Sequence, residues 1–332
     1  MKKVAWGVLS TANIGISKVL PAMQKAEWCD IRAIASRSLP AAQAAAEKLG
    51  IPKAYGSYEE LLADPEIEAI YNPLPNDLHV PMTLAAARAG KHVLCEKPIA
   101  LTASQAEELR AVADKVHITE AFMVRIHPQW QRARELVRSG ELGELRTIQT
   151  FFSYYNVQPN NIRNRVEVGG GALYDIGCYP IVTARFLFEA EPCRAVALFD
   201  RDPMFRTDRN VTAIVDFGEG RRLDFTVSTQ SAPYQRVNVV GTKKRLEIHI
   251  PFNAVPGQQM RIFLDDGSLP GAAAAVAEEM PACDQYGLQG DAFARVVRGE
   301  IKAPYGVEDA IANMRVIDAI FRSDMNGGWE NI

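Results

Sequence analysis

One stretch decides the fold: VAWGVLSTANIG, from Val4 to Gly15. Its apolar start, Val4 to Leu9, predicts a buried strand, and a helical pattern follows from near Ile14 to Lys25. The turn between them copies the spacing of the fingerprint G-x-G-x-x-G with the small residues Ser10, Ala12 and Gly15. That fingerprint brings a pyrophosphate close to the backbone at a helix N-terminus. An ordinary strand, turn and helix would show the same pattern, so the turn alone leaves both interpretations open.

The next strand, Ile31 to Ala35, ends in Ser36-Arg37-Ser38. A dinucleotide fold holds the adenosine ribose of NAD with an acidic residue at this point, whereas a basic residue accommodates the 2′-phosphate of NADP. No acid is present here, and the Arg37 guanidinium can pair with phosphate and stack on adenine. We therefore expect NADP(H) rather than NAD(H). The alternative is that these residues only begin a helix, with Ser38 as its N-cap before Pro40.

Two further strand ends carry polar side chains. The strand Ala69 to Asn72 runs into a proline-rich loop that ends at His79, and the apolar run Lys91 to Leu94 leads into Cys95-Glu96-Lys97-Pro98. Doubly wound sheets bind ligands at the carboxyl ends of their strands, so we expect these loops beside the cofactor. Two alternatives stay open. Glu96 and Lys97 can form a solvated surface pair, and His79 can pack against the helix that follows it rather than take part in chemistry.

The composition is that of an ordinary globular protein, and 332 residues are enough for two domains. A net charge of -3 gives no reason to expect a nucleic-acid partner. The five cysteines are scattered without CxxC spacing, which predicts reduced thiols in a cytoplasmic protein and no metal site. No apolar run approaches the roughly 20 residues of a membrane span, and the N-terminus leaves no room for a signal peptide. We expect a cytoplasmic protein without membrane contact.

The second half turns to a different pattern. A helix at Glu120 to Val137, which Pro128 can interrupt, is expected to connect the halves. A strand at Leu145 to Tyr154 and a helix at Ala172 to Phe188 follow, and Pro270 to Ala277 is expected as a helix or loop. Glycines at 218–220 and 241 predict hairpins within a run of strands, expected at Ala195–Phe199, Thr212–Phe217, Arg222–Ser228, Gln235–Val240 and Lys244–Ile250.

These elements predict an α/β protein of two domains. Residues 1–122 are expected to form a Rossmann dinucleotide-binding domain. Residues 123–332 are expected to form a substrate-binding and dimerisation α+β domain with an open, largely antiparallel sheet. The last two helices, near Asp284 to Arg298 and Val307 to Arg322, should pack back as scaffold. An apolar sheet face of this size favours a homodimer, or a dimer of dimers, through the sheets.

The helix after Gly169-Gly170-Gly171 carries the pair Asp175 and Tyr179. Residues four apart are neighbours on a helix, so both side chains should lie on one face. A base that removes the proton of a sugar hydroxyl must lie within hydrogen-bond reach, and a nearby ammonium favours the phenolate form of tyrosine. We expect Lys97 to supply that charge if the domains meet across a cleft. Without further support, a structural Asp-Tyr pair remains the alternative.

Arginines and a tyrosine elsewhere in this half are candidates to line the substrate cleft. They are Arg163 and Arg165 in the polar loop before the glycines, and Tyr234 in the strand region. Salt bridges at the rim explain the two arginines equally well.

Taken together, these motifs resemble the Gfo/Idh/MocA oxidoreductase family, and Glu96-Lys97-Pro98 is the most specific of them. The segments Glu120 to Pro128 and Gly169 to Tyr179 are similar to a branch of sugar and dihydrodiol enzymes. That branch holds NADP-dependent D-xylose dehydrogenases, dimeric dihydrodiol dehydrogenases and glucose-fructose oxidoreductase. Many members have a histidine where this chain has Tyr179, which favours that branch over inositol-type enzymes.

The resemblance implies roles for individual residues. Lys97 would orient the substrate near the nicotinamide, Tyr179 would donate and accept the proton, and Asp175 would bind a neighbouring hydroxyl. The implied cofactor-binding residues are Ser10, Thr11, Ala12, Asn13, Ile14, Ser36, Arg37, Ser38, Pro73, Leu74, Asn76, His79, Glu96, Lys97 and Arg125. The implied substrate-binding residues are Lys97, Arg163, Asp175, Tyr179 and Tyr234.

The expected activity is NADP(H)-dependent oxidation of a small sugar or polyol, such as D-xylose to its lactone. Alternatives are reduction of a keto-sugar and oxidation of a trans-dihydrodiol. A self-recycling glucose-fructose oxidoreductase is disfavoured, because such members resemble exported proteins with an added N-terminal segment. The rival from another class is a non-catalytic NADP-sensing regulator, which would explain the cofactor motifs but not Lys97, Asp175 and Tyr179 together.

Overall fold

The computed structural model describes residues 2–332, which form two compact units. Unit 1 combines Met1–Met123 with Asp284–Met314, and unit 2 combines Val124–Cys283 with Arg315–Ile332. Within residues 2–332, no helix is long and apolar enough to cross a membrane. No three His, Cys, Asp or Glu side chains in this range gather as a metal centre would require.

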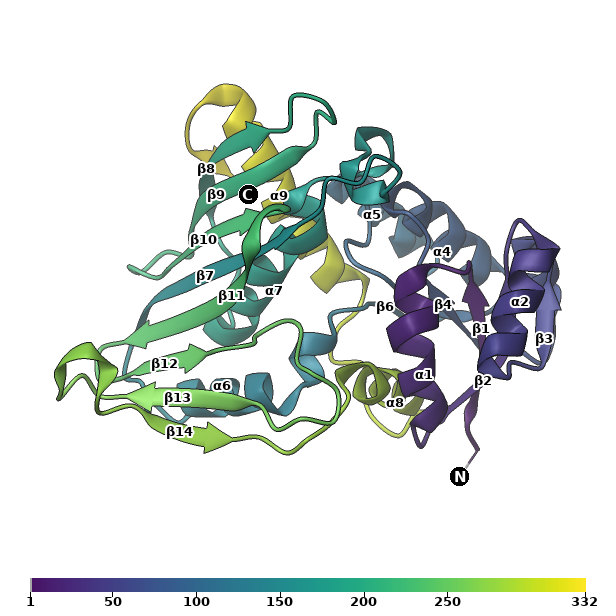
Figure 1. Cartoon of the computed structure of the whole chain (residues 1–332), viewed down its shortest axis with the longest axis horizontal. Coiled ribbons are helices and arrows are strands. Elements are labelled where there is room, and N and C mark those ends of the chain that lie inside the picture. The colour runs from purple at the N-terminus through teal and green to yellow at the C-terminus, as the bar shows by residue number, and fades with distance from the viewer. Residues whose placement is uncertain (1) are drawn as a thin grey trace. The chain divides into compact units, whose positions relative to one another are not determined.

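Unit 1 is built on a six-stranded parallel sheet with the order β3-β2-β1-β4-β5-β6 (Figure 1). The first strands are added on one side of β1, and β4, β5 and β6 are added on its other side. The switch point between β1 and β4 is where doubly wound sheets bind ligands. The strands are β1 (Val4–Leu9), β2 (Cys29–Ala35), β3 (Lys53–Tyr55), β4 (Ala69–Asn72), β5 (His92–Cys95) and β6 (Ile118–Glu120). The helices are α1 (Leu20–Lys25), α2 (Leu39–Leu49), α3 (Tyr58–Ala63), α4 (His79–Arg88), α5 (Ala103–Glu107) and α8 (Gln285–Val297). The predicted Rossmann fold is confirmed.

Two helices of this unit begin at serine caps, and the predicted cap at Ser38 is confirmed. The Ser38 hydroxyl caps α2 by accepting a hydrogen bond from Ala41 N, and the Ser57 hydroxyl caps α3 by accepting one from Glu60 N. Each cap satisfies one backbone N–H that has no partner inside the helix. Helix α2 ends at Gly50, whose positive φ of 65° suits a glycine.

The predicted helix Glu120 to Val137 is wrong at its start. Glu120 ends the sixth strand of the parallel sheet, and α6 begins only at Pro128 and ends at Arg138. His127 has extended backbone and caps the helix by accepting a hydrogen bond from Gln129 N. The residue before a proline avoids helical backbone, and proline itself suits the first helical position. Pro128 therefore starts this helix rather than interrupting it.

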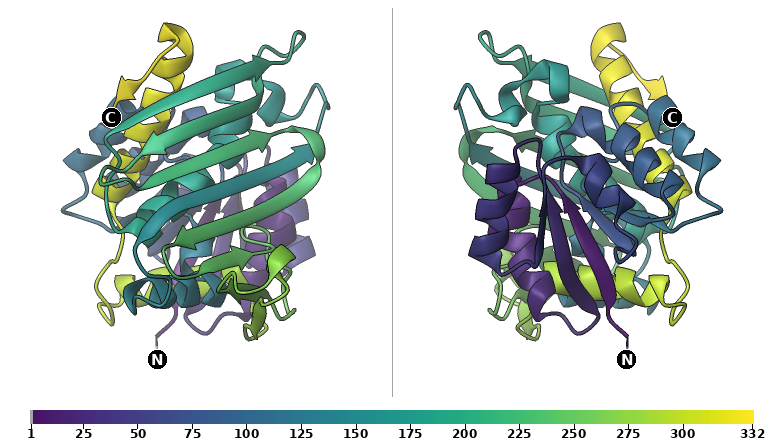
Figure 2. Two further views of the ribbon diagram at one scale, coloured as in Figure 1. Left: turned by 90° about the vertical axis from the view of Figure 1, so that its left-hand side faces the viewer. Right: turned by 90° about the vertical axis from the view of Figure 1, so that its right-hand side faces the viewer.

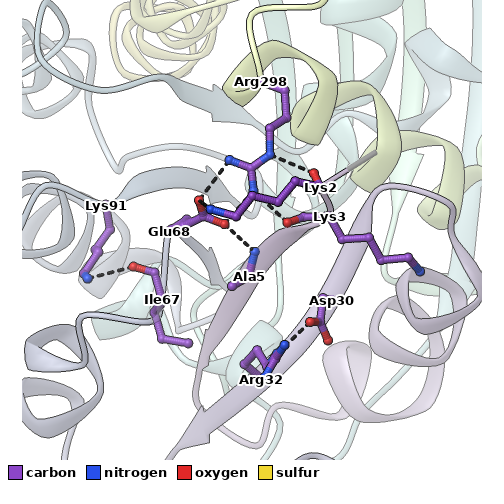
Figure 3. Close-up of polar contacts among 9 residues, drawn as sticks. All are labelled: Lys2, Lys3, Ala5, Asp30, Arg32, Ile67, Glu68, Lys91 and Arg298. Atoms are coloured by element: carbon purple, nitrogen blue, oxygen red, sulfur yellow. Dashed lines mark hydrogen bonds and ion pairs between the residues drawn. The ribbon is translucent and has the colours of Figure 1, made fainter.

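Helix α8 returns to unit 1, whereas the predicted division placed it with the second domain. Its Asp291 carboxylate accepts hydrogen bonds from the backbone N–H groups of Glu27 and Trp28. Arg298 follows its last residue and holds the end of the helix. Its guanidinium pairs with Glu68 at 2.6 Å and donates hydrogen bonds to Lys2 O and Lys3 O (Figure 3). These contacts join sequence positions more than 200 apart, which no local pattern could predict.

The Arg298–Glu68 pair makes the stability of unit 1 depend on pH. Its hydrogen bonds hold the Glu68 pKa at about 2, against a usual value of 4.5. Because the folded pKa is the lower one, this stabilisation is complete above about pH 4.5 and is lost as the pH falls toward 2. We expect Arg298→Met to lower the free energy of unfolding by about 1–2 kcal/mol at neutral pH, as measured by urea denaturation.

The matched control for that experiment is Arg32→Met. Arg32 forms a surface pair with Asp30 that Figure 3 also shows, and its side chain is 47% exposed. This variant should unfold like the wild type. The difference between wild type and Arg298→Met should shrink as the pH falls from about 5 to about 2.5. A difference that stays constant over this range would contradict the role given to Glu68.

Unit 2 is built on a nine-stranded sheet with the order β14-β13-β12-β11-β7-β10-β9-β8-β15. Only β7 and β10 pair in parallel among its described strands, so the predicted largely antiparallel sheet is confirmed. The strands are β7 (Leu145–Tyr155), β8 (Arg194–Arg201), β9 (Asp208–Asp216), β10 (Arg222–Ser228), β11 (Gln230–Gly241), β12 (Arg245–Ile248), β13 (Arg261–Asp265), β14 (Val276–Glu279) and β15 (Glu330–Asn331). Helix α6, helix α7 (Cys178–Phe188) and the long α9 (Val307–Asn326), whose last residues belong to this unit, complete it.

The predicted helix or loop at Pro270 to Ala277 is confirmed as far as Ala275, and only its last two residues belong to the strand Val276–Glu279. A short 3-10 turn covers only Pro270–Ala272, and the chain then pairs with β13 at the sheet edge. The turn stays short because Gly271 inside it has a positive φ of 66°, which is not helical backbone. Pairing with β13 then decides the backbone conformation.

The two faces of the nine-stranded sheet differ in burial. On β7, Ile148, Thr150 and Phe152 are buried, whereas Phe151 and Tyr155 are exposed. The buried side chains lie on the face that α7 covers. Within this unit, the exposed side chains lie on the other face, which is open to solvent. The left-hand view of Figure 2 looks onto the second face, where the strands lie in front of α7.

Candidate active site

The turn after β1 has the shape that a nucleotide-binding turn needs. Ser10 has a positive φ of 86°, which is uncommon for any residue but glycine. Its backbone N–H donates to Ala35 O at 2.9 Å, and its hydroxyl accepts from Ala12 N at 3.2 Å. A Cβ added at Gly15 would meet Tyr71 at an ordinary 3.6 Å. The serine therefore makes the tight turn for which the fingerprint uses glycine, and residues 10–15 fit a dinucleotide.

Arg37 follows the carboxyl end of β2 and is exposed. Burial raises the pKa of Tyr58 on α3, and the Arg37 guanidinium beside the phenol opposes that shift. The same stretch also begins α2 through the Ser38 cap. The helix-cap interpretation of Ser36-Arg37-Ser38 is thus confirmed, and it is compatible with the cofactor interpretation, which stays a prediction. A guanidinium without a neighbouring acid at this strand end fits a 2′-phosphate.

His79 is only 1% exposed, and both of its ring nitrogens face backbone carbonyls. Nδ1 lies 2.7 Å from Pro98 O, and Nε2 lies 2.7 Å from Leu74 O. Burial outweighs these two contacts and lowers the His79 pKa to about 4. The imidazole joins the loops after β4 and β5, as the packing alternative expects, and its contact with the cofactor stays a prediction. His79 supports the site from behind.

Glu96 is anchored to a fully buried side chain. The Tyr71 hydroxyl donates to Glu96 Oε1 at 2.7 Å, and Glu96 N donates to Asn72 O at 3.0 Å. Burial first, and then the Glu96 charge, raise the Tyr71 pKa well above its usual value, which keeps the phenol a donor. A solvated surface pair would not be tied to the core in this way. Lys97 follows in the same loop, and its charge helps to lower the His79 pKa.

In unit 2, Asp175 is the centre of a polar cluster. Its Oδ2 accepts a hydrogen bond from the Tyr154 hydroxyl at 2.5 Å and one from Arg163 Nε at 2.9 Å. The carboxylate is the main cause that raises the Arg163 pKa, and the Tyr179 phenol contributes to the same shift. Arg163 therefore lies beside both members of the predicted pair. Sequence reasoning missed Tyr154, although the alternation along β7 could have placed it on the inner face.

Tyr179 is 6% exposed and lies among aromatic rings. Its ring centroid is 5.2 Å from that of Phe252 and 6.1 Å from that of Phe152. The segment before it, Leu173–Gly177, is a π-helical turn that continues directly into α7. Such turns within helices are frequent at functional sites. The apolar ring packing fixes the direction of the phenol.

Asp208 holds the beginning of this helical segment. It lies at the start of β9, and its Oδ2 accepts from Leu173 N at 2.7 Å. Burial raises its pKa to about 7. A Cβ added at Gly171 would lie 1.9 Å from Asp208 Oδ1, and one added at Gly170 would lie 2.6 Å from Arg163 O. A side chain at either glycine would thus clash with its surroundings, and Asp208, which the sequence did not reveal, is the main cause at Gly171.

The remaining predicted site residues lie elsewhere. Tyr234 pairs with Ser153 and packs its ring on Phe151, so it lies on the solvent face of the sheet, opposite Asp175. Its predicted substrate contact is not supported by this placement. Arg165 pairs with Glu167 at the surface, as the rim alternative expected. Arg125 is 2% exposed in a 3-10 turn of unit 2, and Gln131 donates to its carbonyl.

The predicted residues therefore gather into two groups. Unit 1 brings together the β1 turn, Arg37 and the loops after β4 and β5. Unit 2 brings together Asp175, Tyr179 and Arg163. The prediction that Lys97 and Tyr179 share one substrate joins the two units and stays a prediction.

Two family models match the chain. One describes an oxidoreductase family with an NAD-binding Rossmann fold and matches residues 5–124. The other describes a GFO/IDH/MocA C-terminal domain and matches residues 130–247. The chain belongs to the Gfo/Idh/MocA family. This Gfo/Idh/MocA protein is an oxidoreductase, which removes the support for the regulator alternative.

Relatives agree over nearly the whole length of this oxidoreductase. It is 46% identical to an uncharacterized oxidoreductase of Rhizobium meliloti, with 100% of each chain covered. It is 39% identical to D-xylose 1-dehydrogenase (NADP(+)) 2 of Haloferax volcanii, over 97% of this chain and 98% of that one. Among solved structures, it resembles a 3-ketoreductase of Actinomadura kijaniata in complex with NADP and TDP-benzene, with a TM-score of 0.90, 29% identity, and 97% and 98% coverage.

Proposed function

We propose that this oxidoreductase oxidises an aldose such as D-xylose at its anomeric carbon, with Tyr179 as acid and base. The observation that carries this is a buried phenol one helical turn after a carboxylate that is already held by Tyr154 and Arg163. The identity to a D-xylose dehydrogenase over 97% of this chain supports the substrate class. The finer choice among sugars depends on hydroxyl stereochemistry, and the fold does not carry that information.

We expect NADP(H) as the cofactor because of the Ser10 turn and the basic strand end at Arg37. When bound, NADP⁺ accepts the hydride that leaves the carbon of the alcohol. The side chains of the protein transfer the proton. The substrate hydroxyl gives its proton to Tyr179 in the phenolate form as the carbonyl forms, and the resulting phenol later releases a proton to water. Lys97 would hold the reacting oxygen, and Asp175 would accept a hydrogen bond from a neighbouring hydroxyl.

A second candidate is reduction of a keto-sugar, the reverse of the same chemistry. The likeness to a 3-ketoreductase favours it, and Tyr179 would then donate the proton. A spectrophotometric screen separates the candidates: NADP⁺ is tested with aldoses and diols, and NADPH with keto-sugars. Activity on an aldose with formation of its lactone supports the first candidate. Activity confined to NADPH and keto-sugars would replace it with the second.

Arg37 gives a quantitative expectation for the cofactor preference. Arg37→Ala should lower kcat/KM for NADP⁺ by about 10–100-fold, because a charge-assisted pair with the 2′-phosphate is lost. The value for NAD⁺ should change little, since NAD⁺ lacks that phosphate. Steady-state kinetics with both cofactors measure the ratio. Equal efficiency of the wild type with NAD⁺ and NADP⁺ would contradict the assignment.

We also propose that two copies associate through the solvent face of the nine-stranded sheet. Large exposed hydrophobic side chains gather on it from several strands: Phe151, Tyr155, Leu198, Ile214 and Tyr234. Leu198 is 78% exposed, an unusual placement for leucine on a free surface. Sedimentation should find a dimer, and the double variant Leu198→Lys, Ile214→Lys should shift it to the monomer. A wild type that sediments as a monomer at micromolar concentration would refute this interface.

A further inference from the structure

His79 lies between two loops of unit 1 that carry predicted functional residues. It is the first residue of α4 and is 1% exposed. Its Nδ1 lies 2.7 Å from Pro98 O, in the loop after β5 that also carries Lys97. Its Nε2 lies 2.7 Å from Leu74 O, in the loop after β4. One buried ring therefore contacts both the loop of the predicted catalytic lysine and a loop that is predicted to bind the cofactor.

The ring has one proton for these two carbonyl oxygens. Burial is the main reason why the His79 pKa falls to about 4; the two carbonyls and the Asp77 charge oppose this shift, and the Lys97 charge adds to it. The imidazole is therefore neutral at neutral pH, with one N–H donor and one nitrogen lone pair. A lone pair makes no hydrogen bond to a carbonyl oxygen and is repelled by it. Only one of the two loops can thus accept a hydrogen bond from His79 at a time.

Other hydrogen bonds hold the course of each loop. After β4, the Asn72 side chain accepts from Leu74 N at 3.3 Å and donates to His79 O at 3.2 Å. After β5, Ile99 N donates to the Glu120 carboxylate at 2.7 Å. These bonds do not involve the imidazole, so both loops keep their course wherever its proton lies. The position of the proton decides only which of the two carbonyl groups is held by the ring.

We propose that His79 is a positioning residue with two states: its proton holds either Pro98 O, and with it Lys97, or Leu74 O, and with it the loop after β4. The first state favours the chemical step, and the second favours cofactor binding. In the exchange, water adds a proton to one ring nitrogen and accepts the proton of the other, so the charge of the ring is unchanged. This inference rests on the proposed function, because it takes Lys97 as the group that holds the reacting oxygen.

Two variants each keep one of the two donors. The amide nitrogen of asparagine takes the place of Nδ1, and that of glutamine takes the place of Nε2, so His79→Asn should hold Pro98 O and His79→Gln should hold Leu74 O. We expect His79→Asn to keep kcat within about twofold of the wild type and to weaken NADPH binding, measured by fluorescence, about 5–10-fold. His79→Gln should bind NADPH normally and lower kcat about 10–100-fold, because a small misplacement of Lys97 slows the chemical step.

The matched control is His117→Asn, since His117 is exposed just before β6, and this variant should change neither quantity. Nitrogen NMR of the histidine-labelled wild type tests the proton directly, with the His79 signals identified by their loss in His79→Asn. We expect a neutral ring at neutral pH whose two nitrogens share the proton. An imidazolium, a proton fixed on one nitrogen, or the same changes in kcat and NADPH binding for both variants would overturn the two-state role. A fully active Lys97→Met would instead overturn the proposed function and leave the NMR result unchanged.

Discussion

Tyr179→Phe lowers kcat by about 100-fold or more, because general acid–base catalysis by a positioned side chain contributes about 10²–10⁴-fold. Phenylalanine keeps the ring that packs on Phe152 and Phe252, so the fold should survive the change. NADPH binding, measured by fluorescence, should stay unchanged, since the proposed role of the lost hydroxyl is proton transfer alone. Steady-state kinetics should show kcat and kcat/KM falling together, the mark of an interaction made in the transition state.

The matched control for this variant is Tyr234→Phe. Tyr234 was a predicted substrate residue, but it lies on the solvent face of the sheet with its ring against Phe151. Its loss of a hydroxyl should leave turnover within about twofold of the wild type. A large fall in kcat for Tyr234→Phe, or near-normal turnover for Tyr179→Phe, would reverse the two assignments.

Local patterns predicted unit 1 well because its elements are decided by residues close in sequence. The β1 strand and the caps at Ser38 and Ser57 depend on side chains within three residues of the backbone that they serve. The error at Glu120 to Val137 has the opposite origin. The predicted helix begins too early, because pairing with the distant strand β5 places Glu120 in the sheet and Pro128 sets the helix start.

The site could be predicted only in part, since its support comes from residues distant in sequence. Asp175 and Tyr179 stood out because they share one helical turn. Tyr154 is 21 positions from Asp175, and Asp208 is 35 positions from the Leu173 N–H that it binds. Sheet register and strand order bring these groups together, and neither can be obtained from a helical period. The same holds for Tyr234, whose face of the sheet follows from its pairing with Ser153.

Gly171→Ala should destabilise unit 2 by about 3–5 kcal/mol, the largest effect on stability that we expect from one added methyl group. The new Cβ would lie 1.9 Å from Asp208 Oδ1, and the φ of +123° is itself strained for alanine. Asp208 would have to withdraw and give up its 2.7 Å hydrogen bond from Leu173 N. The start of the helix that carries Asp175 and Tyr179 would then lose its anchor. Urea denaturation measures the loss of stability.

Gly218→Ala separates the two causes. Gly218 also has a positive φ, +72°, but an added Cβ there meets nothing within 4 Å. It should cost only about 1 kcal/mol, the price of left-handed backbone for alanine. Asp208→Ala relieves the clash, so the double variant Gly171→Ala, Asp208→Ala should be less destabilised than the sum of the single variants. Additive losses would show that backbone strain alone makes Gly171 necessary, and that Asp208 does not hold the start of the helix that carries Asp175 and Tyr179.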